Sequence, residues 1–346
     1  MKKFLKVTLA CVLAAWMFGV APADAQIRKA GITGASFLKI GVGARAVALG
    51  SAYTTVSGDV NQMFWNPAGV AITGGKTQVT FSYNQWIADL NHVAAGISHD
   101  FGTWGTWGIG AVKLGVSDIE ASRDVVPGFL AGSFTPFDNG TSATYDYNDT
   151  AINITWALNF TDKLSMGITG KYINQSIDGE SASAVAMDVG AVYKIGYKGA
   201  RLGARISNLG SDLKFYEVGA PLPLIFSYGA AIDLVSNEEQ GMRLTAFADA
   251  NKPQDNEQLF FTSGELALKE MFFVRGGYKI NYSGTTDQKT DEVTRARVDA
   301  SRSEEGFTLG AGVKVPVSGF NIAVDYAFTE FGILDSVHRV SMNLDF

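Results

Sequence analysis

The sequence predicts an all-β protein, a transmembrane antiparallel β-barrel of about fourteen strands with an amino-terminal hatch, or plug, segment. Three observations predict it. Segments of roughly ten residues, the length that a tilted strand needs to cross a bilayer, alternate apolar with small or polar residues. The connections between these segments are alternately short and longer. The chain also ends on an aromatic residue, Phe346, on the apolar face of its last segment.

The amino terminus has the pattern of a secretory signal peptide. Basic residues at 2, 3 and 6 precede an apolar run over 7–20 and the small-x-small sequence at 23–25. We therefore expect residues 1–25 to be a signal peptide and the mature protein to begin at Gln26. Cys11 is the only cysteine, so the mature chain would have no disulfide and no cysteine-ligated metal.

Composition excludes two other classes. Removal of residues 1–25 leaves 25 basic and 33 acidic residues, a net charge of −8, so we expect no nucleic-acid partner. Mean hydropathy is only +0.09, and no mature segment has the 18 uninterrupted apolar residues typical of a membrane helix. A barrel is compatible with this average because every second strand residue faces the lumen.

Residues 26–75 do not alternate cleanly. Their small residues are spaced as in short helical turns and tight loops, for example at Gly43-Ala44-Arg45-Ala46. We expect this segment, called the hatch below, to fold into or beneath the barrel formed by residues 76–346.

Fourteen segments then have strand character. The weakest alternation is at 107–116 and 259–268. The predicted strands are 78–86, 93–101, 107–116, 151–160, 164–175, 184–195, 201–208, 222–234, 242–251, 259–268, 271–282, 307–315, 320–328 and 337–346.

The connections distinguish a membrane barrel from a soluble antiparallel sheet, whose half-buried strands alternate in the same way. The second, fourth, sixth, tenth and twelfth connections are short, whereas the third, seventh and eleventh are long and the eighth is intermediate. Tight turns at one end and loops at the other are typical of outer-membrane barrels. We therefore expect a bacterial outer-membrane protein with both termini in the periplasm, and we expect its first and last strands to pair because free edges are costly in lipid.

The block from Phe37 to Val70 resembles the PorV/PorQ family of outer-membrane proteins, itself similar to the FadL-like transporters. The resemblance rests on 37–41, 43–46, 49–53 and 65–69, with Leu49 where many relatives have methionine. It covers about thirty-five residues and is carried by motif residues within the hatch: Gly43, Arg45, Asn66, Pro67, Ala68 and Gly69.

The resemblance implies two functions. A PorV-like protein would be a carrier or docking barrel of a type IX-like secretion route, with secreted cargo proteins and secretion-system components as partners. The alternative is a FadL-like channel that takes up hydrophobic small molecules through a lateral opening. In both cases outer-membrane lipid surrounds the barrel.

Strand parity places a set of charged residues in the lumen, where charge is tolerated if it is hydrated or paired. We expect these residues to tie hatch to wall, with Arg45 reaching a carboxylate such as Asp188 or Asp325, although a role in guiding substrate is the alternative. The set includes Asp188, Arg205, Asp233, Arg275, Lys314 and Asp325.

Glycines are dense in the third strand, at Gly108 and Gly110 among others. Glycine inside a strand often marks a kink, and in FadL-like barrels a kink in this region opens a side window. We therefore predict a lateral window near these two glycines. The alternative is that they let the hatch approach the wall closely.

No enzyme chemistry is predicted. Gly41-x-Gly43-x-x-Ala46 matches a dinucleotide fingerprint in form but lacks the surrounding βαβ unit. His99 and Asp100 are adjacent on a strand and so face opposite sides. We expect no catalytic residues, no metal site and no cofactor.

Overall fold

The structure is a computed structural model of the chain. It describes residues 31–72, 74–120, 144–237, 239–255, 258–281, 288–290, 297–299, 306–331 and 336–346. The predicted signal peptide, residues 1–25, lies outside the described residues.

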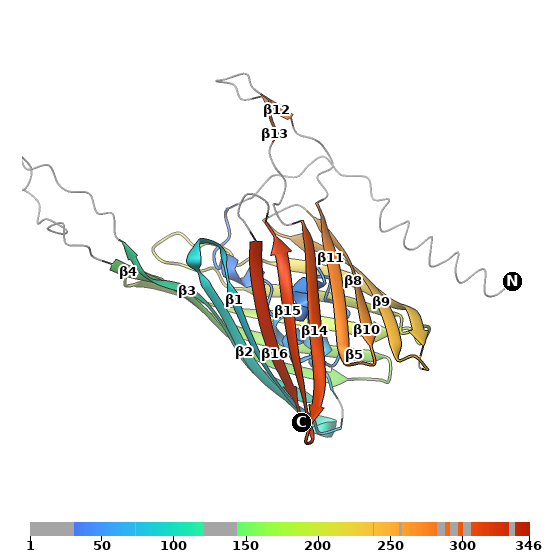
Figure 1. Ribbon diagram of the computed structural model, residues 1–346. Coiled ribbons are helices and arrows are strands. Elements are labelled where there is room, and N and C mark those ends of the chain that lie inside the picture. Colours follow the sequence, from blue (N-terminus) through green and yellow to red (C-terminus); the bar gives the residue numbers. More distant parts are fainter. Residues whose placement is uncertain are drawn as a thin grey trace, which may run out of the picture.

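Fourteen antiparallel strands close into a barrel, which confirms the predicted fold class and strand number (Figure 1). Each strand pairs with its neighbours in sequence, and β1 pairs with β16. The barrel strands are β1 (Thr77–Gln85), β2 (Asn91–Asp100), β3 (Thr106–Glu120), β4 (Thr144–Asn159), β5 (Leu164–Ile177), β6 (Glu180–Lys194), β7 (Arg201–Gly210), β8 (Ile225–Asn237), β9 (Met242–Pro253), β10 (Leu259–Leu268), β11 (Phe272–Asn281), β14 (Phe307–Val317), β15 (Phe320–Glu330) and β16 (Ser336–Asp345). A separate ribbon of β12 (Gln288–Thr290) and β13 (Arg297–Asp299) lies in the connection between β11 and β14.

The two ends of the chain's barrel region close the sheet. Thr77 N donates to Phe346 O at 2.6 Å, and Phe346 N donates to Thr77 O at 2.9 Å. The register then runs without a break from Gln78 opposite Asp345 to Asn84 opposite Arg339. Closure leaves no unpaired edge, which is the condition for a sheet to lie in hydrocarbon.

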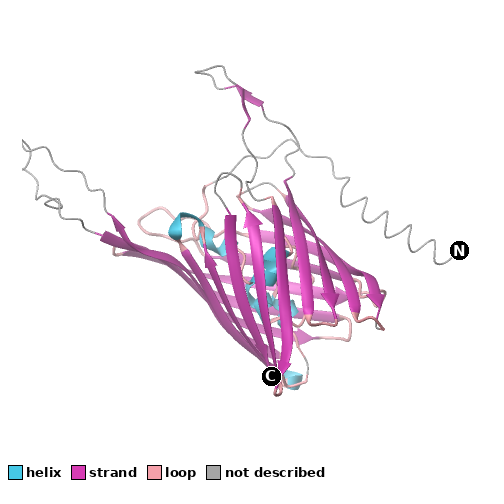
Figure 2. Cartoon of the chain, in the orientation of Figure 1, coloured by secondary structure: helices cyan, strands magenta, loops and turns pink. Residues whose placement is uncertain are grey.

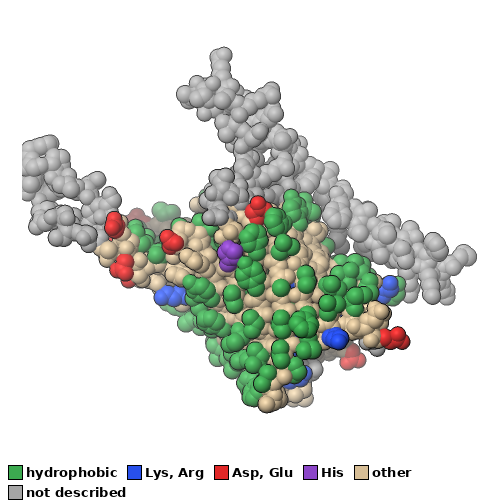
Figure 3. Space-filling view, in the orientation of Figure 1, with side chains coloured by type: hydrophobic (Ala, Val, Ile, Leu, Met, Phe, Trp, Pro, Cys, Tyr) green, Lys and Arg blue, Asp and Glu red, His purple; other side chains and the backbone are tan. Residues whose placement is uncertain are grey.

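The outer surface is apolar. On β3, for example, Trp107 and Ile109 point outward while Val112 and Leu114 point into the lumen. Figure 3 shows the hydrophobic side chains spread over the barrel face that it displays. Such a surface suits contact with lipid rather than water.

The hatch lies inside the barrel as short helices joined by tight turns (Figure 2). These are η1 (Ser36–Lys39), α2 (Ala44–Ala48), η2 (Val60–Phe64) and η3 (Pro67–Val70). Helix α2 packs on β14 and β15, and η3 packs on β4, β5 and β6. Two further one-turn helices, η4 (Ile87–Asp89) and η5 (Gly102–Trp104), lie in wall turns.

The hatch runs from one end of the barrel to the other. We call the end that bears Phe346 the short-turn end and the opposite one the long-loop end. At the long-loop end, Gly34 N donates to Pro221 O at 2.9 Å. At the short-turn end, Gln78 Nε2 donates to Gly58 O at 3.1 Å. The first described residues therefore lie at the end opposite to Phe346, whereas the amino terminus itself lies outside the described residues.

Glycines in the wall make room for the hatch. A Cβ on Gly167 of β5 would lie 2.5 Å from the carbonyl carbon of Pro67 and 2.7 Å from Ala68 N. Gly170, three residues further along the same strand and on its outer face, has open space around it.

We expect Gly167→Ala to destabilise the folded barrel by about 1–3 kcal/mol, because the methyl group would meet rigid backbone of η3. Gly170→Ala is the matched control and should change stability little. The midpoint of heat-induced loss of the compact form on SDS gels measures both. Equal midpoints for the two variants would show that η3 is not seated tightly on β5.

Candidate functional site

The motif Asn66-Pro67-Ala68-Gly69 forms the start of η3. Asn66 Oδ1 accepts from Ala68 N at 3.2 Å and so caps the helix, whose first residue is Pro67. Asn66 Nδ2 donates to Thr54 O at 2.7 Å, inside the hatch, and to Ala191 O of β6 at 3.3 Å. Gly69 has no room for a Cβ because Val56 O and the Gln62 side chain lie against it. The motif thus holds the hatch in shape and attaches it to the wall.

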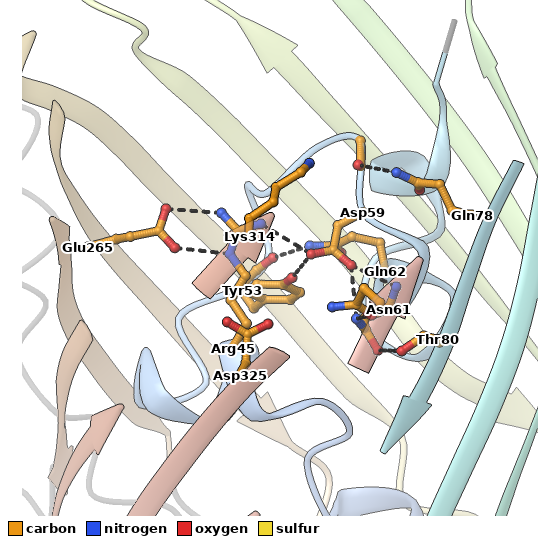
Figure 4. Close-up of polar contacts among 12 residues, drawn as sticks. Arg45, Tyr53, Asp59, Asn61, Gln62, Gln78, Thr80, Glu265, Lys314 and Asp325 are labelled. Atoms are coloured by element: carbon orange, nitrogen blue, oxygen red, sulfur yellow. Dashed lines mark hydrogen bonds and ion pairs between the residues drawn. The ribbon is translucent and has the colours of Figure 1, made fainter. Parts of the chain in front are cut away.

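Gly43 and Arg45 lie at the start of α2. Gly43 has φ +84, a left-handed conformation that favours glycine, and its N–H donates to Ser82 Oγ of β1. Arg45 points toward the opposite wall. Its Nε and Nη2 donate to the two carboxylate oxygens of Glu265, both at 3.0 Å, and its Nη1 lies 3.2 Å from Asp59 Oδ2 (Figure 4).

Arg45 does reach a wall carboxylate, as expected, but the partner is Glu265 of β10 rather than Asp188 or Asp325. Glu265 is fully buried and also pairs with Arg275, whose Nη1 in turn donates to Asp325 Oδ1 at 2.5 Å. Opposite charges thus alternate from the hatch into the wall, through Asp59, Arg45, Glu265, Arg275 and Asp325.

Tyr53 completes this network within the hatch. Its hydroxyl donates to Asp59 Oδ2 at 2.5 Å. Burial, together with the charge of Asp59, raises the pKa of Tyr53 well above its ordinary value, so the phenol remains a neutral donor. Asp59 also accepts from Asn61 N, which fixes the turn that begins η2.

The other predicted lumen charges also have polar partners. Asp188 pairs with Lys171 at 2.6 Å. Arg205 donates to Trp65 O at 2.7 Å and lies over the Trp65 ring. Asp233 Oδ1 accepts a hydrogen bond from Thr245 Oγ1 at 2.7 Å, and Lys314 Nζ donates one to Asp345 Oδ2 at 2.9 Å.

The structure has no lateral window at Gly108 and Gly110. Both residues pair in register with β2 and β4, and the only irregularity of β3 comes later, between Val116 and Ile119. A Cβ on Gly110 would overlap Met63 and Phe64 of η2, and one on Gly108 would lie 3.1 Å from Met63 Cε. These glycines let the hatch approach the wall closely, which was the alternative interpretation.

Two larger cavities remain between hatch and wall. One of about 500 Å³ opens at the short-turn end and is lined by both signs of charge, including Arg45, Arg243, Asp59 and Glu270. The other, of about 330 Å³, lies at the long-loop end and is called the outer cavity below. The outer cavity is our candidate functional site.

The outer cavity has an apolar side and a cationic side. Phe37, Ile40 and Val47 of the hatch line it, together with wall residues such as Trp86 and Leu114. Phe37 and Leu114 belong to a larger apolar cluster that follows the inner faces of β2 to β6. The cationic lining residues are Lys39, Lys279 and Arg339.

Sequence reasoning missed Glu265 and the importance of Arg339. The inner face of β10 carries the apolar residues Phe261 and Ala267 as well as Glu265. The alternation of apolar and polar residues therefore did not identify which face of β10 points into the lumen. Arg339 is on the polar face of the last strand, and that position was its only signal. Trp86 follows β1 directly and has the parity of the inward-facing Asn84, so periodicity places it inside but does not show that it lines a cavity.

Within the described ranges, no helix combines the length and apolarity required for a membrane crossing. The same part of the chain contains no group of three or more His, Cys, Asp or Glu side chains that could hold a metal ion.

No family model matches the chain, and neither does any curated protein. Solved structures do. The toluene transporter TbuX of Ralstonia pickettii matches with a TM-score of 0.53 and 11% identity, over 88% of this chain and 97% of that one. The toluene transporter TodX of Pseudomonas putida gives 0.52 and 12%, over 88% and 97%. A FadL homologue of Pseudomonas aeruginosa gives 0.50 and 10%, over 88% and 98%. The chain therefore has the FadL-like barrel fold.

We expect Glu265→Gln to loosen the hatch, because it leaves the buried Arg275 and the hatch residue Arg45 without a shared counter-charge. Breaking such a buried pair costs about 3–5 kcal/mol. Single-channel recording in planar bilayers should show more frequent open events than in wild type. Glu270→Gln is the matched control, since Glu270 is 64% exposed and its pair with Arg243 contributes under about 1 kcal/mol. Identical conductance of the two variants would contradict the role of Glu265.

A second contact between hatch and wall, at Asp255, should weaken in acid. Asp255, between β9 and β10, accepts from Thr33 Oγ1 at 2.6 Å and from Lys39 Nζ at 2.7 Å. Burial opposes the charge of Asp255, but these two donors hold its pKa below the ordinary value. Its stabilising effect is therefore present above about pH 4, the ordinary carboxyl range, and is lost as pH falls through the lower folded-state pKa. Asp255→Asn should unfold at a lower temperature than wild type at pH 7, and the difference should vanish toward pH 3. A difference in unfolding temperature that persists at pH 3 would show that the stabilisation does not come from the charge of Asp255.

Proposed function

We propose that this protein is an outer-membrane channel for hydrophobic small molecules. The observation that carries the proposal is the outer cavity, an apolar-sided space between hatch and wall at the long-loop end. The shared fold supports it, because the structures with which the chain aligns include toluene transporters. Its volume of about 330 Å³ lies within the range of small-molecule sites.

The hatch is the barrier to passage. All fourteen strands pair around the barrel, so a molecule in the outer cavity has no gap in the wall. The ion pairs from Asp59 to Asp325 lie beyond it in the lumen. Uptake therefore requires the hatch to move or a strand pair to separate. A lateral exit would require a strand pair to separate, because the wall has no preformed window at Gly108 and Gly110.

Secretion remains a second candidate. The hatch block that resembles PorV/PorQ proteins favours it, and so do two apolar side chains of the connection between β7 and β8. Tyr216 and Val218 are 77% and 87% exposed at the long-loop end, where they could contact a cargo protein. Deletion of the gene separates the candidates, since a carrier for cargo would change the secreted proteome and a hydrocarbon channel would not.

We expect Leu114→Asn to slow uptake of radiolabelled toluene several-fold in cells that depend on this channel, because an unpaired amide in the outer cavity disfavours an apolar guest. Val192→Asn is the control. It places the same buried amide on the inner face of β6, away from the cavity lining, and should leave uptake near the wild-type rate. Uptake should be normalised to the amount of heat-modifiable, folded barrel. Equal rates in both variants, or uptake independent of the protein, would refute the proposal.

A further inference from the structure

Four polar side chains form a row on the outer surface of the barrel wall. Lys113 of β3 lies opposite Thr150 of β4, and Thr150 lies opposite Asn174 of β5. Asn174 in turn lies opposite Ser183 of β6. The residues just before each of the four are buried in the lumen, so these four point outward. We call them the Lys113 row.

The Lys113 row is the level at which the apolar outer surface of β3 to β6 ends. One pleat nearer to the short-turn end, the outward residues of these strands are apolar or aromatic: Ala111, Ile152, Tyr172 and Val185. One pleat nearer to the long-loop end, they are small or polar: Gly115, Asn148, Ser176 and Ser181. Because lipid tails cover the apolar part of a barrel and water covers the polar part, the row lies at the level of the lipid headgroups.

Strands β3 to β6 extend beyond the hydrocarbon at this end. Elsewhere the wall is apolar close to its long-loop edge, as where Phe260 of β10 lies opposite Ile280 of β11. Strand β3 also continues past β2, since their pairing stops at Asn91 opposite Gly115 (Figure 1). The Lys113 row is therefore the base of a part of the wall whose outer face meets headgroups instead of lipid tails.

Lys113 is a cation without a partner on this surface. Its side chain is exposed, and within the described ranges it forms neither an ion pair nor a hydrogen bond. Three exposed carboxylates, at Asp118, Asp146 and Asp178, lie nearer to the strand ends. They repel an anion there, so an anionic group is attracted only at the level of Lys113.

The other side chains of the row are neutral hydrogen-bonding groups. Asn174 Nδ2 donates to Ser183 Oγ at 3.1 Å, and the Tyr172 hydroxyl lies 2.9 Å from the same oxygen. These contacts hold the amide in place and leave Asn174 Oδ1 as an acceptor. Thr150 Oγ1 makes no hydrogen bond within the described part of the chain, so it is available as a donor or an acceptor.

We propose that the Lys113 row binds the headgroup of a glycolipid in the outer leaflet, with the ammonium on a phosphate and the neutral side chains on the sugar. The long-loop end of an outer-membrane barrel faces the cell exterior, so the leaflet at this level is the outer one. A phosphorylated sugar fits because it combines anionic oxygens with hydroxyls. A phosphate alone would engage Lys113 and leave Thr150 and Asn174 unused. The proposal does not depend on what passes through the barrel.

The test uses the full-length protein in detergent and native mass spectrometry, which resolves each bound lipid. The probes are diphosphoryl lipid A, phosphatidylglycerol and phosphatidylcholine. Wild type should bind diphosphoryl lipid A at least about tenfold more tightly than phosphatidylcholine, the factor that one charge-assisted hydrogen bond supplies. Lys113→Gln should remove most of this preference, whereas Lys113→Arg should keep it.

Lys163→Gln is the matched control, because Lys163 is an exposed lysine in the turn between β4 and β5, at the short-turn end. It should bind all three lipids as wild type does. The double variant Thr150→Val with Asn174→Leu keeps the charge and removes the neutral hydrogen-bonding groups. It should lower the affinity for lipid A to that for phosphatidylglycerol. Heat-modifiability on SDS gels verifies folding of every variant.

Three outcomes would overturn the proposal. Equal binding of lipid A and phosphatidylcholine to wild type would show that there is no headgroup site. An unchanged preference in Lys113→Gln would place the site elsewhere. Binding of phosphatidylglycerol as tight as that of lipid A would show that the sugar is not recognised. None of these outcomes bears on the proposed channel, which the uptake assay with Leu114→Asn tests separately.

Discussion

The position of the hatch depends on one buried carboxylate. Glu265 accepts from Arg45 through both oxygens and from Arg275 at 2.7 Å, so a single negative charge joins a hatch residue to the wall. Without it, the guanidiniums of Arg45 and Arg275 would lose their shared counter-charge. Most other residues of α2 are alanines, whose packing is close but weakly directional. The ion pairs therefore determine the orientation of the hatch, and the small residues determine how near it lies.

The close approach explains why the hatch block is so rich in small residues. Gly50 of the hatch lies against Gly277 of β11, Thr54 lies against Gly203 of β7, and Ala48 lies against Gly310 of β14. At each contact a glycine on one segment leaves room for the other segment to approach closely. The hatch block thus specifies how a plug fits a fourteen-strand barrel.

Strand periodicity predicted the strands and their faces because the alternation of apolar and polar residues is a local property of the sequence. The apolar side chains that face lipid make this alternation regular. It could not predict partners across the lumen. Parity placed Asp325 and Arg275 inside, but only the closed barrel shows that Glu265 stands between Arg45 and Arg275. The glycines of β3 show the same limit. The sequence shows that glycines are dense in β3. Only the structure shows that they make room for Met63 of the hatch.

The two ends of the lumen are electrostatically different, and the hatch connects them. At the short-turn end cations and carboxylates alternate, whereas the outer cavity has cations and no lining carboxylate. Lys39 lines that cavity and also pairs with Asp255, so a guest that displaces the Lys39 side chain would break this ion pair. Release of Lys39 would weaken the joint that holds the start of the hatch, while Glu265 still holds α2. A guest could thus free one end of the hatch before the other, which makes stepwise opening less costly than displacement of the whole segment.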